Sequence, residues 1–247
     1  NNGNGISSGH VRVFQTGIST EPLSEIDTIP PVSPVLLTEE IKTNVSTPTI
    51  TGNAEANSTV KLYKGSITDN KTITHVVSVE AKTVEHNSYS SGSSLGYKID
   101  NKFAPYLTLT PGNTYIFDQS DSSNLNHPLL FYLDSNKANS YAENVKSIGT
   151  PGADGAYTEI QITSTSPETL YYQCGNHGLM GDSVRTNLGS TTADNNGIFS
   201  IISTRLIEGN YSLTATATDD AGNVSPPSSE LSINVVLDDG DASFSIS

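Results

Sequence analysis

Leu170-Tyr171-Tyr172-Gln173-Cys174-Gly175-Asn176-His177-Gly178-Leu179-Met180-Gly181 is the stretch that decides how this sequence is interpreted. A strand-like run leads into the single Cys and the single Met of the 247 residues, with one of the five His between them. A thiolate, an imidazole and a thioether at i, i+3 and i+6 are potential metal ligands, and sulfur ligands favour copper. Two His and one Cys in a trigonal plane with a weak axial Met form a type-1 copper site. The second imidazole is expected from a strand well upstream.

The composition indicates an all-β protein. Hydrophobic residues make up 34% of the chain and charged residues only 15%. Short strand-like runs alternate with turn dipeptides rich in Gly, Asn, Ser and Pro, a pattern typical of β-sandwiches. The length suits one or two domains, and we expect two.

Charge and hydropathy exclude two classes of partner. A net charge of −14 with 12 Lys and Arg argues against binding to nucleic acid, because neutralising phosphates requires a basic surface. No apolar run reaches the roughly 18 residues of a membrane-spanning helix, so we expect no membrane span. One Cys cannot form an internal disulfide.

Two separated parts of the chain resemble the bacterial Ig-like repeat of adhesins. The first part is a strand, turn and strand in residues 47–66, and the second comprises residues 188–200 and Gly209-Asn210-Tyr211-Ser212-Leu213-Thr214-Ala215-Thr216-Ala217-Thr218-Asp219-Asp220-Ala221-Gly222-Asn223. The resemblance implies one Ig-like β-sandwich made of residues 35–68 and 188–237. Residues 69–187 would then be an insertion in a loop between neighbouring strands, where domain insertion is tolerated.

The inserted block has its own strand pattern. We predict strands at residues 72–79, 96–100, 106–110, 114–117, 127–132, 156–162 and 170–173. About seven strands at this spacing, with no helical periodicity, fit a Greek-key β-sandwich. His127 begins one of these strands, 47 positions before Cys174, and is the candidate for the missing imidazole.

The block as a whole resembles the cupredoxin family. The residues that carry the resemblance are 97–100, Leu107-Thr108-Leu109-Thr110-Pro111-Gly112-Asn113-Thr114-Tyr115-Ile116-Phe117-Asp118, Asn126-His127-Pro128-Leu129, 152–158 and 171–181. The resemblance implies a copper ion held by His127, Cys174, His177 and Met180. This sequence departs from the family at one position. In the family, an Asn often follows the first His, and its side chain ties the two ligand loops together. Here Pro128 takes that place and Asn126 precedes the His, so Asn126 is only a candidate for the tie.

The same Cys, Met and His residues allow other interpretations. A lone Cys or Met is usually a core residue, and zinc could use the same atoms, although Met is a poor zinc ligand. His75 and His86 lie outside the motifs and are expected on the surface of a strand and a loop. No set of catalytic residues stands out, so we expect no enzyme, and five His are too few for a multicopper oxidase.

The two ends of the chain suggest neighbouring repeats. Residues 2–14 resemble the end of an FG-GAP-type repeat, residues 17–34 contain a Pro-rich linker, and residues 238–247 resemble the start of a further repeat. His10 is expected to be a strand residue. Clustered oxygen donors at Asp219, Asp220 and Asn223, and at Asp238, Asp239 and Asp241, could bind Ca²⁺, but a solvated acidic turn is the favoured interpretation.

Taken together, the sequence predicts a segment of a secreted or cell-surface bacterial multi-repeat protein. The segment would carry a type-1 copper site for one-electron transfer or copper binding, with an unidentified redox partner or none and with neighbouring repeats of the same chain as partners. The alternative is a structural or adhesion spacer in which the metal only stabilises the fold or is absent.

Overall fold

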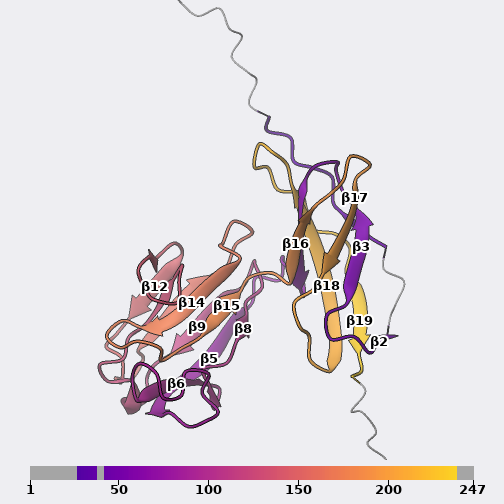
Figure 1. Ribbon diagram of the computed structural model, residues 1–247. Coiled ribbons are helices and arrows are strands. Elements are labelled where there is room, and N and C mark those ends of the chain that lie inside the picture. The colour runs from indigo at the N-terminus through magenta and orange to yellow at the C-terminus, as the bar shows by residue number, and fades with distance from the viewer. Residues whose placement is uncertain (1–26, 38–41, 238–247) are drawn as a thin grey trace, which may run out of the picture.

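The computed structural model describes residues 27–37 and 42–237. Within them the protein is built almost wholly of β-strands, with a single 3-10 turn, η1 (Ser122–Asn124), as predicted from the composition (Figure 1). None of the helical structure in these residues is long enough to cross a bilayer. The predicted repeat similarities at residues 2–14 and 238–247, and His10, lie outside the described residues.

The first two sheets use strands from both ends of the described chain. One has the order β1 (Val35–Leu36), β3 (Thr49–Asn53), β17 (Ile198–Ile202). The other has the order β16 (Gly189–Thr192), β4 (Thr59–Lys64), β18 (Gly209–Thr218), β19 (Leu231–Val235), β2 (Lys42–Thr43). Their inward side chains form one apolar cluster, which includes Ile50, Leu62, Phe199 and Leu213. We call this unit the split sandwich.

The other two sheets come from the middle of the chain and form the central sandwich, residues 72–185. One has the order β11 (Ser140–Tyr141), β10 (Leu129–Tyr132), β14 (Thr169–Cys174), β15 (Ser183–Arg185), β8 (Leu107–Thr108). The other has the order β12 (Val145–Ile148), β13 (Tyr157–Gln161), β9 (Thr114–Asp118), β5 (Thr72–Ala81), β6 (Leu95–Ile99), β7 (Lys102–Phe103).

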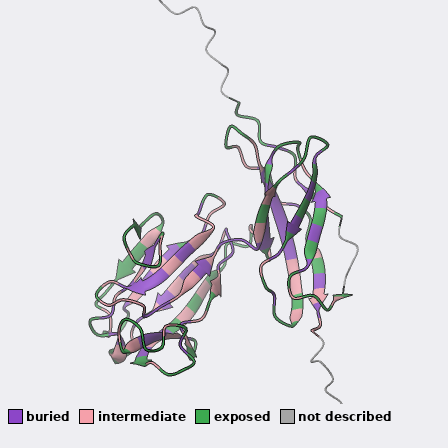
Figure 2. Ribbon diagram, viewed as in Figure 1, coloured by how far each residue is buried: buried purple, intermediate pink, exposed green. Residues whose placement is uncertain are grey.

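The alternation of side chains explains why these runs form sandwiches. In β3 and β17, buried and exposed residues alternate strictly, and β9 and β13 alternate buried with partly exposed residues. Successive side chains of a strand point to opposite faces, so such a strand covers a core with one face and meets solvent with the other. Figure 2 shows this alternation as stripes of buried and exposed residues along the arrows. The core of the central sandwich contains Phe117, Phe131, Tyr172, Cys174 and Met180.

The chain leaves and re-enters the split sandwich at neighbouring points. Strand β4 precedes the central sandwich and β16 follows it, and the two strands pair antiparallel with Leu62 opposite Gly189. The amide of Leu188 donates to the carbonyl of Leu62 at 2.6 Å, whereas the amide of Thr186 still donates to Glu168 at 3.1 Å. Figure 1 shows the chain passing between the two bodies after β4 and before β16. The ends of the central block therefore lie close together.

Most predicted strands are present, with shifted ends. The strand expected at 127–132 begins only at Leu129, so His127 lies in the turn before it. The strand expected at 106–110 shrinks to Leu107–Thr108, which pairs parallel with β15. Strands β7, β11, β12 and β15 were not predicted, because each is short or almost wholly exposed and lacks a clear apolar alternation.

Candidate metal centre

The antiparallel pairing of β10 with β14 brings the predicted ligands to one place. Leu129 at the start of β10 lies opposite Cys174 at the end of β14. The residue two positions before Leu129 is His127, and the residue three positions after Cys174 is His177. Because antiparallel strands place the start of one beside the end of the other, both loops meet at the same end of the sheet.

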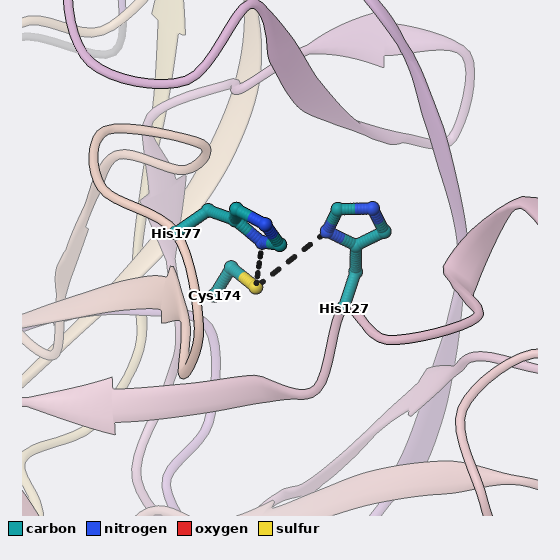
Figure 3. Close-up of side chains that lie close together, drawn as sticks. All are labelled: His127, Cys174 and His177. Carbon is teal, nitrogen blue, oxygen red and sulfur yellow. Dashed lines mark hydrogen bonds between the residues drawn. The ribbon is translucent and has the colours of Figure 1, made fainter.

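Three donor atoms converge there (Figure 3). The sulfur of Cys174 lies 3.5 Å from Nδ1 of His177 and 3.7 Å from Nδ1 of His127. The two imidazole rings are 4.7 Å apart between centroids. His127, Cys174 and His177 are the one group of at least three His, Cys, Asp or Glu donors found close enough to hold a metal ion among residues 27–37 and 42–237.

The spacing of these donors fits a shared metal ion. Metal–sulfur bonds of about 2.3 Å and metal–nitrogen bonds of about 2.0–2.1 Å, at tetrahedral to trigonal angles, separate the two donors by roughly 3.5–3.8 Å. The two sulfur–nitrogen distances fall within this range. Both rings also turn the same atom, Nδ1, toward the sulfur, so the donor set suits a Cys and two His ligands bound to one ion.

Burial favours the neutral, metal-binding form of His127. The ring is 7% exposed and Cys174 is fully buried, whereas His177 is the more accessible of the three. Burial, and to a smaller extent the neighbouring His177, lowers the pKa of His127. Since a metal binds the neutral imidazole, the ring does not have to release a proton at neutral pH to act as a ligand.

Met180, the fourth predicted ligand, belongs to the same core as Cys174. Its side chain is fully buried in the apolar cluster of the central sandwich. Its backbone carbonyl accepts hydrogen bonds from the Tyr97 amide at 2.8 Å and from Nε2 of His86 at 3.1 Å. The structure thus fixes the backbone of Met180 tightly, and its role as an axial ligand stays a prediction.

Buried polar side chains hold the loop that carries His127. The carbonyl of His127 accepts hydrogen bonds from the Tyr97 hydroxyl and from Nε2 of Gln119, each at 2.8 Å. Oε1 of Gln119 accepts from the amide of Leu129 at 3.1 Å. We did not single out Tyr97 or Gln119 from the sequence. Gln119 follows directly after β9, whereas Tyr97 lies in the middle of β6, within the stretch 97–100 of the resemblance, and neither position indicates a contact with His127.

The tie between the two ligand loops differs from the expected one. The side-chain amide of Asn176 donates to the backbone carbonyl of Asn126 at 2.8 Å. The amide of Gly175 donates to the carbonyl of Pro128 at 2.9 Å. The candidate role for the Asn126 side chain is therefore wrong: Asn176, within the Cys-to-Met loop, supplies the side chain, and Asn126 supplies only its carbonyl.

His86 is buried, which corrects its predicted position on a loop surface. The ring is 2% exposed and packs near Phe103. Nδ1 accepts from the amide of Ser88 at 3.0 Å, so Nε2 carries the proton and donates to the carbonyl of Met180. Burial lowers the pKa of His86. Because His86 belongs to no motif, the sequence alone contained no sign of this contact.

His75 and the acidic turn are separate from the site. His75 is partly exposed on β5, lies against the ring of Tyr115 and pairs with Asp100 at 2.7 Å.

Asp219 turns both carboxylate oxygens toward Asn223, at 2.8 and 2.9 Å. Both oxygens of this carboxylate therefore serve hydrogen bonds within the turn. The second predicted calcium cluster, Asp238, Asp239 and Asp241, lies outside the described residues.

Comparison with known proteins supports one of the resemblances. Residues 179–238 match the sequence model of the bacterial Ig-like domain family, about a quarter of the chain. The matched range contains β15, from the central sandwich, and β16 to β19, while β3 and β4, which pair with β17 and β18, lie far outside it. No curated protein matches the sequence.

Two solved structures show weak similarity. One is a crystal structure of a rusticyanin variant with one His replaced by Met, at 16% identity and a TM-score of 0.25, covering 49% of this chain and 86% of the other. The second is the BSP domain of a biofilm-associated protein, at 13% identity and a TM-score of 0.19. That alignment covers 83% of this chain but only 30% of the other.

Proposed function

We propose that the central sandwich is a type-1 copper domain whose ligands are His127, Cys174, His177 and Met180. The observation that carries the proposal is the convergence of the Cys174 sulfur with Nδ1 of both His at distances suited to one ion. A buried thiol and two imidazoles favour copper or zinc. A thioether in the same core shifts the preference toward copper, because structural zinc sites use Cys and His.

The chemistry of the site would be one-electron transfer or copper holding. Bound copper supplies the Cu(I)/Cu(II) couple. The protein's own contribution is a site with few ways to rearrange: Cys174 ends a strand, His127 is fixed through its carbonyl, and Asn176 joins the two loops. Such a frame keeps ligand positions similar in both oxidation states. No substrate-converting step is part of the proposal.

The wider setting is a bacterial Ig-like domain that carries the copper domain as an insertion. The borders we propose are residues 69–187 for the copper domain and residues 35–68 and 188–237 for the two parts of its host. The pairing of β4 with β16 supports these borders, because it keeps the two ends of the insertion adjacent. We further propose an extracellular or cell-surface location, with neighbouring repeats of the parent chain as partners.

Reconstitution with Cu(II) tests the copper site. An intense thiolate-to-copper charge-transfer band in the visible spectrum is expected, as a Cys-ligated trigonal site should give. The band should vanish in Cys174→Ser and persist in His75→Gln, a His outside the site. If the protein remains colourless and loses all copper on dialysis, the proposal fails.

The second candidate function is a structural or adhesion spacer, in which a metal only joins the loops or is absent. The family match of residues 179–238 favours it, since Ig-like repeats commonly serve as spacers. Thermal melts with copper and with chelator, together with the rate of electron exchange, separate the two. A large rise in melting temperature combined with slow electron exchange would favour the spacer.

A further inference from the structure

Lys137, from the hairpin between β10 and β11, contacts three backbone carbonyls of the ligand loop. Its ammonium donates to the carbonyls of Cys174 at 2.9 Å, His177 at 3.1 Å and Gly175 at 3.4 Å. A lysine ammonium has three N–H donors and no acceptor. All three donors are therefore directed at the loop that contains two of the proposed copper ligands.

The hairpin around Lys137 is shaped for this contact. Lys137 has a φ of +64°, a left-handed conformation that is uncommon for residues other than Gly. Asp134 supports the turn: its carboxylate accepts hydrogen bonds from the amides of Ala138 and Asn139, both at 2.8 Å. Backbone strain of this kind persists only where the surrounding contacts determine the conformation. Here those contacts direct the Lys137 side chain toward the loop that follows Cys174.

The Lys137 ammonium reduces the electrostatic repulsion between backbone carbonyls of the loop. Three carbonyl oxygens that point to one place repel one another, and backbone groups that are not satisfied favour a different loop conformation. A cation among them relieves the repulsion, and hydrogen bonds to a charged group are roughly twice as strong as neutral ones. No metal is needed for this interaction.

We infer that Lys137 is a positioning residue, which holds Cys174 and His177 in their ligand arrangement before copper binds. That this arrangement serves copper binding rests on the proposed function. The hydrogen-exchange test on metal-free protein does not depend on it. An ordered apo loop avoids the entropy loss of ordering on binding. The ammonium also adds a positive charge beside the Cys174 carbonyl. Because Cu(II) carries one more positive charge than Cu(I), that charge disfavours the oxidised form and raises the reduction potential.

The test compares Lys137→Met, which keeps the length of the side chain but removes the charge, with Lys137→Arg, which keeps the charge. Lys146→Met is the matched control, because it removes the same charge from β12, where the ammonium pairs with Glu159. In metal-free protein, amide hydrogen exchange is followed at Gly175, whose amide donates to Pro128 across the two loops. In copper-loaded protein, the reduction potential is measured.

Lys137→Met removes three charge-assisted hydrogen bonds and should speed exchange at Gly175 roughly tenfold or more, the factor expected from the loss of even one of them. It should also lower the reduction potential, where each tenfold change in relative affinity for Cu(II) and Cu(I) corresponds to about 59 mV. Lys137→Arg should keep both the exchange rate at Gly175 and the reduction potential close to the wild-type values, and Lys146→Met should change neither quantity. Unchanged exchange at Gly175 in Lys137→Met would overturn the inference. A wild-type protein that takes up no copper would instead refute the proposed function, and the exchange measurement on metal-free protein would still decide the role of Lys137.

Discussion

The side chain of Asn176 joins the two ligand loops through the backbone of Asn126, at 2.8 Å. The two residues are fifty positions apart in the sequence and lie beside His177 and His127, respectively. Asn126 has a φ of +64°, which turns the chain sharply before His127. This side-chain hydrogen bond, together with the backbone bond from Gly175 to Pro128, connects the loop of one proposed imidazole ligand to the loop of the other.

Asn176→Ala should loosen this connection at a small cost in stability. A typical hydrogen bond contributes about 0.5–1.5 kcal/mol to the free energy of unfolding, and the exposed position of Asn176 favours the lower end. Release of Cu(II) to a chelator should become faster because the two loops can separate more easily. Urea denaturation and stopped-flow absorption measure the two effects. Asn210→Ala, at an exposed residue of β18 in the split sandwich, should leave the release rate unchanged; an equal acceleration there would contradict the role of Asn176.

His86→Ala should destabilise the protein more strongly. The buried ring donates to the carbonyl of Met180, and its removal leaves that carbonyl with one donor, the Tyr97 amide, while also opening a cavity beside Phe103. The lost hydrogen bond costs about 0.5–1.5 kcal/mol, and the cavity left by the ring adds to that loss. The free energy of unfolding of metal-free protein in urea measures the change. His75→Ala is the control, since His75 is partly exposed and its ring makes one hydrogen bond, to Asp100, and it should cost clearly less.

Acid should weaken the hairpin that presents Lys137. Burial opposes the charge on Asp134, but hydrogen bonds from Ala138 and Asn139 outweigh it and lower the pKa of the carboxyl. Because the folded pKa lies below the unfolded value of about 3.9, the stabilisation is complete above that value and is lost as the pH falls through the folded pKa. Amide exchange at Ala138, corrected for the intrinsic pH dependence of exchange, should therefore show falling protection below about pH 4. Asp134→Asn should remove this dependence; an unchanged acid transition in the variant would contradict it.

The all-β class and the position of most strands could be predicted from the sequence because both depend on local patterns. Residues 114–117 are β-branched and aromatic, and residues 156–162 show a period of two; such runs are typical of strands. The convergence of His127, Cys174 and His177 was also predictable, since ligand types and spacing are visible in the residues themselves.

The supporting contacts could not be predicted in the same way. Lys137 is a hairpin lysine in the sequence, and only its left-handed backbone and the fold of its loop direct it at the Cys174 carbonyl. The burial of His86 depends on a contact with Met180, ninety-four positions away. Asn176 supplies the tie in place of Asn126, because which side chain faces the other loop depends on backbone dihedrals that the residue type does not determine.

Two glycines of the ligand loop allow a sharper test of how tightly the loop is packed. A Cβ at Gly181 would lie 1.9 Å from the backbone carbonyl of Tyr172, while a Cβ at Gly178 would meet nothing within 4 Å. Gly181→Ala should therefore push the end of the loop away from β14 and lower the free energy of unfolding by about 1–3 kcal/mol, the usual cost of overpacking. It should also disturb the copper spectrum, because Met180 is the adjacent residue. Gly178→Ala introduces the same methyl group two residues from Met180, in open space, and should leave both stability and spectrum close to wild type. If Gly181→Ala changed stability and spectrum as little as Gly178→Ala, the loop could shift freely against β14. That result would contradict a rigid ligand frame.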